Sequence, residues 1–410
     1  MIVGLLAAAL AAPWVGQTHL SWTAGGTLEA RGRSAVPGDK PYAEAAADGE
    51  MTPRLGATVT NGEWSAALSY TPVFRIREPY SSTTWRNEHT QAGQFNAQWR
   101  RPGLMRPYLS QSVLYGLTDL STLFATPARS TLPGVTNTPV NRVSTQPVPT
   151  LGLVRQFDLD STLGIDWPLA PTVLLTTELG YFWGGGSDRA SRQNMPVQSS
   201  PRLIARLGWT ASRIDTLTTS LAARYAKFSS QQAVTSIELS EIWQRSLSDS
   251  VRLDVSAGLA AAGGQNRPGR PIDGGLLPLA AVNLSGGFGV RSHHFEAYGG
   301  VLAAPFIDRF AGSVYERVEM NAGISWAWVV GVNAYARLGV ARGLGPLSGN
   351  LFTTYSEGGA GYAGAPWWRV DLIGRFSSVS GPPTPAQPNS SPLLQWVVGL
   401  SATFQTQGDT

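Results

Sequence analysis

Apolar and polar residues alternate along most of the chain, with the period of two that is typical of a β-strand having one apolar and one polar face. In the first such segment, Trp22, Leu28 and Ala30 fall on one face, and Thr23 and Glu29 fall on the other. The scheme recurs in segment after segment, and aromatic residues lie near the ends of the apolar faces. Many such strands in succession indicate a barrel with lipid outside and water inside.

The connections between these segments alternate between tight and long. Asn61-Gly62 and Ser212-Arg213 are tight, whereas 184–200 and 378–392 are long and rich in Gly, Pro, Ser, Asn and Gln. Transmembrane barrels have short periplasmic turns and long external loops, so both termini are expected in the periplasm. We predict an all-β, antiparallel, up-and-down transmembrane barrel of about eighteen strands, with sixteen as the alternative. The expected strands are about 18–31, 52–60, 63–76, 87–100, 106–117, 149–167, 171–183, 201–210, 215–227, 235–245, 250–261, 278–291, 294–304, 315–328, 331–342, 350–359, 365–377 and 393–405.

Composition narrows the class further. The chain is 42% hydrophobic but only 14% charged, against roughly 25% charged in ordinary soluble domains. No later apolar run approaches the roughly 18 residues of a membrane-spanning helix, which excludes a helical membrane protein. The 14 Trp, 12 Tyr and 13 Phe argue against disorder. The net charge of +4 comes without a dense basic cluster, so no nucleic-acid partner is expected.

The N-terminus contains a short apolar stretch. Residues 2–12 end in Ala9-Leu10-Ala11, a small-residue pattern of the kind that signal peptidase cuts. We therefore expect 1–12 to be a signal-peptide-like segment and 13–410 to be the barrel, without a plug domain. No Lys or Arg precedes Arg31, which favours a true translation start upstream of Met1. An apolar first strand or a loose terminus is the alternative interpretation.

The last strand resembles a known signal. Residues 394–404 form an amphipathic segment in which Gly399, Ala402 and Phe404 occupy the positions of the C-terminal assembly signal of bacterial outer-membrane proteins. Val397, where that signal favours a polar residue, and the tail 405–410 depart from it. The resemblance implies a bacterial outer-membrane location, contact with outer-membrane lipid, and the barrel-assembly machinery as a partner.

If apolar residues face lipid, the alternate residues line the lumen. Acids concentrate on the sixth and seventh strands and arginines are more evenly spread, which predicts opposed charge across the lumen. Salt-bridged ladders along the wall are the equal alternative. Tyr108, Phe182, Tyr298 and Tyr335 are expected inward aromatic residues. The candidate lumen-lining residues are Arg31, Arg54, Arg75, Asp158, Asp160, Asp166, Glu178, Arg202, Arg206, Arg224, Arg252, Asp254, Glu296, Arg337, Arg369, Asp371 and Arg375.

The longest connection, about 118–148, is a candidate constriction. It contains several prolines, and Asp119, Arg129 and Arg142 are available to line an eyelet. In general porins the third external loop folds into the pore, so the resemblance implies that role here. A proline-rich surface loop outside the pore is the plain alternative.

Enzyme chemistry is not expected. The chain has no cysteine, and its four histidines show neither helical spacing nor carboxylate clustering. His293 and His294 are expected in a periplasmic turn. We predict no catalytic residue, no metal and no cofactor.

A barrel this wide with a polar inner face is expected to be a channel for polar solutes. Its strand number, external loops and lack of a plug resemble those of the porin-like barrels that carry exopolysaccharides outward. The resemblance implies an export conduit for a secreted polysaccharide, with a periplasmic export component as partner. The inward tyrosines would then offer sugar-stacking faces. Two alternatives stay open: a general diffusion porin for small solutes, and a structural or adhesive barrel with a closed lumen.

Overall fold

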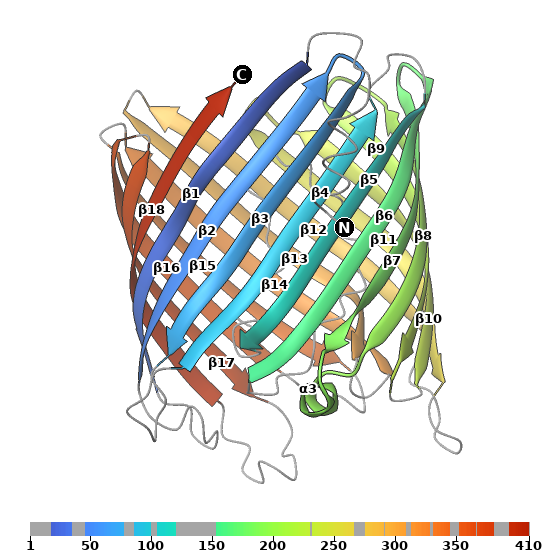
Figure 1. Ribbon diagram of the computed structural model, residues 1–410. Coiled ribbons are helices and arrows are strands. Elements are labelled where there is room, and N and C mark those ends of the chain that lie inside the picture. Colours follow the sequence, from blue (N-terminus) through green and yellow to red (C-terminus); the bar gives the residue numbers. More distant parts are fainter. Residues whose placement is uncertain are drawn as a thin grey trace.

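The computed structural model describes residues 18–34, 46–77, 86–99, 105–119, 153–229, 232–265, 275–290, 292–308, 313–328, 331–344, 352–365, 367–380 and 393–409. Within these ranges, the strands form one closed sheet of eighteen strands (Figure 1). They are β1 (Thr18–Arg33), β2 (Ala46–Asn61), β3 (Trp64–Arg77), β4 (Arg86–Trp99), β5 (Arg106–Asp119), β6 (Leu153–Ala170), β7 (Val173–Gly186), β8 (Gln198–Thr210), β9 (Asp215–Phe228), β10 (Ala233–Ser246), β11 (Val251–Gln265), β12 (Gly275–Val290), β13 (His293–Asp308), β14 (Ser313–Trp328), β15 (Val332–Leu344), β16 (Phe352–Ala365), β17 (Trp368–Ser380) and β18 (Leu393–Asp409).

Every strand pairs antiparallel with its neighbours in the chain, and β18 pairs with β1 to close the barrel. Thr27 and Thr403 lie opposite each other in this last pairing, and their hydroxyl groups are 3.2 Å apart. Closure leaves no strand edge to expose unpaired backbone groups to lipid. The predicted fold class and the count of eighteen strands are confirmed.

The strands run further than the apolar pattern indicated. β2 begins at Ala46, before its expected start at 52, and continues through Asp48 and Glu50. These charged residues break the apolar pattern, but their side chains lie on the inward face. Backbone pairing at this end of the barrel therefore extends beyond the residues whose side chains alternate between facing lipid and facing water.

Tight turns and long connections lie at opposite ends of the barrel. Thr18, at the start of β1, is the register partner of Asn61, beside the tight turn to β3. Asp409 of β18 pairs with Ser21, so both ends of the described chain lie at this tight-turn end, at the top of Figure 1. The turn from β14 to β15 uses Gly331, whose φ of +87° suits glycine. Outer-membrane barrels keep such turns in the periplasm.

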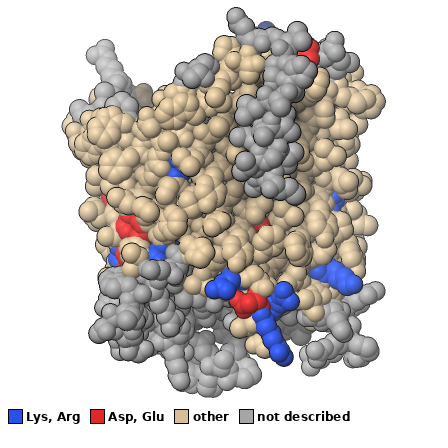
Figure 2. Space-filling model, in the orientation of Figure 1, with Lys and Arg blue, Asp and Glu red and all other residues tan. Residues whose placement is uncertain are grey.

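The outer surface is apolar and carries two aromatic girdles. Leu163 and Leu179 of the central wall are 54% and 60% exposed, which lipid contact explains. In the view of Figure 2, most charged side chains on the visible face lie toward the long-loop end. Girdle residues at the tight-turn end include Trp22, Trp99, Trp167, Trp209 and Trp328, and those at the long-loop end include Phe74, Tyr115, Trp183, Tyr225 and Trp396.

One short helix, α3 (Arg189–Asn194), lies at the long-loop end between β7 and β8 (Figure 1). Asp188 caps it by accepting a hydrogen bond from the Ser191 backbone N–H at 2.8 Å. The hydrogen bonds from Ser191 lower the pKa of Asp188. The Ser191 hydroxyl in turn accepts from the Arg155 N–H at 3.0 Å, which ties the helix to β6. Across the described ranges, no helix is long and apolar enough to cross a membrane.

Candidate functional site

All of the predicted lumen-lining residues lie on described strands, at positions that alternate with lipid-facing side chains. On β6, for example, Leu163 and Ile165 are exposed on the outer face. Asp160 and Asp166 take the alternate positions and point inward.

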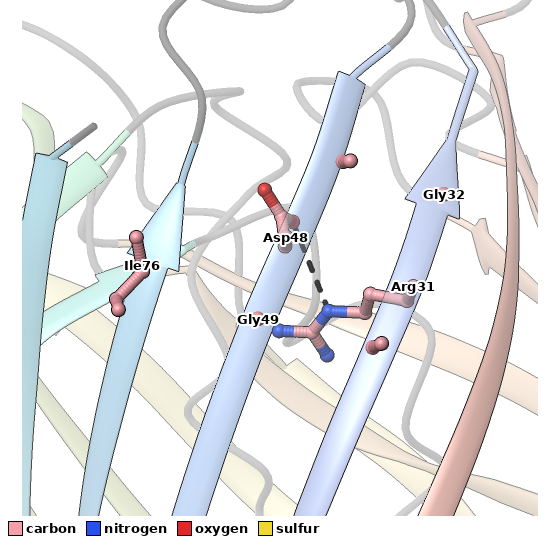
Figure 3. A pocket seen from close by; sticks show the side chains of 7 residues that line it. Arg31, Gly32, Asp48, Gly49 and Ile76 are labelled. Carbon is pink, nitrogen blue, oxygen red and sulfur yellow. Dashed lines mark ion pairs between the residues drawn. The ribbon is translucent and has the colours of Figure 1, made fainter. Parts of the chain in front are cut away.

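The first group of inward charges lies on β1, β2 and β3. Glu50 has Glu29 and Arg75 as its register partners. Its carboxylate accepts hydrogen bonds from Arg31 Nη2 and Arg75 Nη2, both at 2.6 Å. Arg31 Nε also lies 3.7 Å from Asp48 Oδ2, and a dashed line marks this ion pair in Figure 3. One carboxylate thus bonds two guanidinium groups from the strands on either side.

Gly399 leaves room for this group. The residue pairs with Arg31 across the β1–β18 closure. A Cβ there would lie 3.1 Å from Arg31 Cβ and 3.2 Å from Glu29 Oε1. Ala402 and Phe404 lie on the same strand, and Phe404 is 44% exposed on the outer face. Their predicted role in assembly stays a prediction.

The outer surface above this group has a shallow apolar hollow. Ala30, Gly32, Ala47, Gly49 and Ile76 line it from the lipid side (Figure 3). The hollow exists because Ala30, Gly32, Ala47 and Gly49 have small side chains or none. Because it lies outside the barrel wall, it is not part of the lumen.

A second group lies on the wall formed by β5, β6, β7 and β8, here called the β5–β8 wall. Arg202 donates to both oxygens of Asp160, at 2.7 and 3.1 Å, and to the Thr162 hydroxyl at 2.7 Å. To do so, its side chain crosses Gly180 of β7, where a Cβ would clash with the guanidinium. Arg202 therefore bonds a residue two strands away.

Glu178 of β7 is the second carboxylate of the β5–β8 wall that bonds an arginine of β8. It accepts hydrogen bonds from Arg206 Nη1 and from the Tyr108 hydroxyl, both at 2.7 Å. Asp166 accepts from the Thr176 hydroxyl at 2.6 Å. Asp160, Asp166 and Glu178 are therefore each bonded to a donor on another strand. This is the ladder arrangement, and it leaves little charge separated across the lumen.

Other predicted residues are joined mostly in pairs. Arg375 bonds Glu357 at 2.7 Å, and Arg252 bonds Asp254 at 2.8 Å. Further pairs join Arg369 to Asp371 and to Asn333, and His294 to Glu296. Gln156 donates to Asp158, and Arg224 lies beside the buried Glu238. Within the described ranges, no three His, Asp or Glu side chains are grouped so as to hold a metal ion.

Two inward arginines differ from the rest. Arg54 and Arg337 are exposed to the lumen, and no carboxylate of the described residues forms an ion pair with either. The guanidinium of Arg337 lies 5.2 Å from the centroid of the Tyr335 ring. These side chains keep their hydrogen-bond donors available to a solute.

Inward tyrosines lie against glycines of the next strand. Tyr108 faces Gly164, Tyr298 faces Gly323, Tyr335 faces Gly359 and Tyr355 faces Gly339, each pair in direct register. A Cβ at any of these glycines would clash with the tyrosine ring. Sequence reasoning named the first three tyrosines and missed Tyr355. Its alternation with Glu357 and Gly359 was the available signal, inside a weakly patterned segment.

The described end of the β13–β14 hairpin, residues 304–308 and 313–317, here called the hairpin tip, lies against the inside of the barrel. Pairing of β12 with β13 ends at Ala280 and Ala303, although β13 continues to pair with β14 as far as Asp308 and Ser313. Beyond this point, Val314 packs against Phe228 and Val234 on the inner faces of β9 and β10. The tip therefore leaves the barrel wall at the long-loop end and folds over the inside of its neighbours.

The outer face of this tip is buried against the wall. Pro305 and Val314 are at most 2% exposed, and Glu316 is 8% exposed. Neither carboxylate oxygen of Glu316 has a hydrogen-bond partner among the described residues. On the other face of the tip, the Arg317 guanidinium lies 5.1 Å from the Phe306 ring centroid.

The predicted third-loop constriction cannot be placed. Arg129 and Arg142 lie outside the described residues, and of Asp119 only the backbone, at the end of β5, is described. Residues 1–12 lie outside them as well. His293 and His294 begin β13, so the expected turn position was wrong. The ring of His293 stacks with Trp326 and Trp328 in the tight-turn girdle.

Comparison with solved structures gives outer-membrane channels of low identity. OccAB4 of Acinetobacter baumannii is 9% identical, with 95% of this chain and 98% of that chain covered and a TM-score of 0.48. OpdQ of Pseudomonas aeruginosa is 11% identical over 96% and 100%, with a TM-score of 0.45. OccK9 (OpdG) of the same organism is 10% identical over 94% and 98%, with a TM-score of 0.46.

Sequence comparison with curated proteins gives no match. The family model described as the EpsX exopolysaccharide export family matches residues 14–407, which is nearly the whole chain. The match agrees with the closed barrel, its apolar outer surface and its polar inner face. This chain is an outer-membrane barrel that belongs to the EpsX exopolysaccharide export family.

Proposed function

We propose that the lumen of this barrel is the path along which an exopolysaccharide chain crosses the outer membrane. The observation that carries this proposal is the inner face, which combines hydrogen-bonding charged pairs with tyrosine rings set against glycines. Sugars offer hydroxyl groups for hydrogen bonds and C–H faces for aromatic rings, so both features match a saccharide. Side chains do not fill the interior of a barrel this wide, which favours a wet channel.

The predicted lumen-lining residues would serve this path in two ways. Most are held in ion pairs, so they keep the wall rigid and polar without presenting a strong net charge. Arg54 and Arg337 are exposed and have free donors. A polymer moves along such a wall because each contact is weak and is repeated at neighbouring positions.

The finer partner assignments belong to the same proposal. The polymer would enter at the tight-turn end, delivered by a periplasmic export component, and leave at the long-loop end. Short connections at the entrance support this direction, because they leave the rim accessible to a docking protein. Assembly would use the signal at Gly399, Ala402 and Phe404, and the barrel would catalyse no reaction. The segment 1–12 would direct export of the chain to the periplasm.

Single-channel recording in a planar bilayer tests the proposal. Refolded protein should conduct ions, and maltohexaose or an oligogalacturonate of six sugars should block the current in discrete events. A steady current that neither sugar interrupts would favour a general diffusion porin. A sealed barrel that never conducts would favour the structural or adhesive alternative. In cells, deletion of the gene should abolish polysaccharide secretion, and expression of the intact chain should restore it.

A further inference from the structure

A single row of register partners crosses the inner wall from β13 to β17. Tyr298 pairs with Gly323, Gly323 with Arg337, Arg337 with Glu357, and Glu357 with Arg375. All of these residues take inward positions. Direct register partners lie about 5 Å apart, so the row forms one continuous surface.

Two more tyrosines flank Arg337 on this surface. Tyr335 lies two residues before Arg337 on β15, and its ring faces Gly359. Tyr355 of β16 faces Gly339, two residues after Arg337. Tyrosine rings thus lie on three sides of one guanidinium group.

Each ring lies along the wall. A Cβ at Gly323 would be 2.5 Å from Tyr298 Cε1, and a Cβ at Gly359 would be 2.6 Å from Tyr335 Cε1. The rings therefore rest on glycine backbone, and they are only partly buried. One face of each ring is covered by the wall, and the Arg337 guanidinium lies over the Tyr335 ring, 5.2 Å from its centroid.

Arg337 is the available cation of this surface. The neighbouring carboxylate of Glu357 is bonded to Arg375 at 2.7 Å. No carboxylate of the described residues is paired with Arg337, and its side chain is exposed. With two arginines and one glutamate, the row carries an excess of positive charge.

We propose that Tyr298, Tyr335, Tyr355 and Arg337, here called the tyrosine–arginine patch, form a subsite for an acidic sugar of the uronic acid class. The pyranose ring lies on a tyrosine face, and its carboxylate bonds the guanidinium of Arg337. The assignment rests on the proposed function, because it takes the lumen as the saccharide path. It names the class of sugar that this wall selects.

The chemistry of the patch favours a carboxylate over a hydroxyl group. A guanidinium presents two parallel N–H donors that match the two oxygens of a carboxylate. An ion pair in water is worth little, so binding stays weak and a bound sugar is released quickly. Stacking on tyrosine adds affinity without adding charge selectivity.

The test compares a charged and a neutral oligosaccharide on the full-length barrel. Current block by an oligogalacturonate of six sugars and by maltohexaose is titrated on the wild type and on Arg337→Gln. The variant should bind the oligogalacturonate about tenfold more weakly, because a charge-assisted pair is lost. Maltohexaose block should change less than about twofold, since stacking is retained.

Arg54→Gln is the matched control. Arg54 is also inward, exposed and without an ion-pair partner among the described residues, but no tyrosine–glycine pair of the patch adjoins it. The change removes the same charge from the same lumen. If selectivity for the oligogalacturonate fell equally in Arg54→Gln and Arg337→Gln, the result would contradict the patch. It would instead show that selectivity depends on the overall charge of the lumen.

Tyrosine variants test the stacking faces. Tyr335→Leu and Tyr355→Leu should weaken block by both sugars, and Tyr355→Phe should match the wild type because the ring is kept. Unblocked conductance equal to that of the wild type shows that each variant is a folded barrel. If sugars block the wild type but the Leu variants and Arg337→Gln bind them unchanged, the subsite is wrong and the conduit stands. If neither sugar blocks the wild type, the conduit itself is wrong.

Discussion

On the β5–β8 wall, Arg202 and Arg206 are bonded to carboxylates, whereas on the wall from β13 to β17 Arg337 has no carboxylate partner among the described residues. Both walls set tyrosine rings against glycines of the next strand. The hydroxyl of Tyr108 on the first wall is fixed by Glu178. Arginines and tyrosines therefore stabilise the β5–β8 wall, whereas on the wall from β13 to β17 they are proposed to bind a sugar.

The difference arises from where the acids fall. Asp160 and Glu178 lie within reach of the β8 arginines, so their charges are neutralised in place. On the other wall, Glu357 lies between two arginines and forms an ion pair with Arg375, while no ion pair joins it to Arg337 among the described residues. Ion pairs with no net charge stiffen a wall, and an arginine without an ion-pair partner gives the wall selectivity for anionic groups.

The largest effect is expected when the β5–β8 wall and the adjoining strand β9 lose their inward arginines. Replacing Arg202, Arg206 and Arg224 with Ser leaves Asp160, Glu178 and Glu238 without cations, so the lumen should become cation-selective. Each lost pair should also lower the free energy of unfolding by about 1–3 kcal/mol, because the side chains are partly buried. Reversal potentials in a salt gradient and urea unfolding measure the two effects.

Arg54→Ser is the control for that substitution. It removes one cation but breaks no pair among the described residues, so the free energy of unfolding should not change. Unchanged reversal potentials in the triple variant would mean that the paired carboxylates do not face the conducting path.

The hairpin tip packs on β9 and β10, which lie between the two walls in the order of the sheet. Val314→Asp places a charge against Phe228 and Val234, where an unpaired charge is costly. The tip should leave the wall, and the open-channel conductance should rise. Glu316→Gln should act the other way, since it removes a carboxylate whose oxygens have no hydrogen-bond partner among the described residues. Equal conductance in Val314→Asp and wild type would show that the tip does not narrow the lumen.

The period of two was sufficient to predict the number of strands and the side on which the predicted lumen-lining residues lie. Lipid and water impose opposite polarity on the two faces, so the sequence of β6 determines that Asp160 points inward. Partners could not be predicted in the same way. Arg202 reaches Asp160 because Gly180 lies between them, and this depends on the register of three strands.

The hairpin tip shows a second limit of the pattern. Pro305 and Val314 lie just beyond the expected strands 294–304 and 315–328, and continuing the period of two to them would place both on the lipid face. In the structure they pack against the inner wall, because β13 stops pairing with β12 before it reaches its end. An apolar side chain gives the same signal whether lipid or protein covers it. Only the end of a pairing register distinguishes the two cases.

The smallest expected effect is the sharpest test of the comparison, because it adds one methyl group to each wall. In Gly180→Ala the new Cβ displaces Arg202 from Asp160, so both charges are released from their pair, reversal potentials should shift, and sugar block should stay near that of the wild type. In Gly323→Ala the Cβ meets the Tyr298 ring, so sugar block should weaken by a few-fold and reversal potentials should stay unchanged. The two variants carry the same change in volume and no change in charge. If both variants altered both measurements equally, the walls would not have separate roles, and the division between a structural and a binding wall would fail.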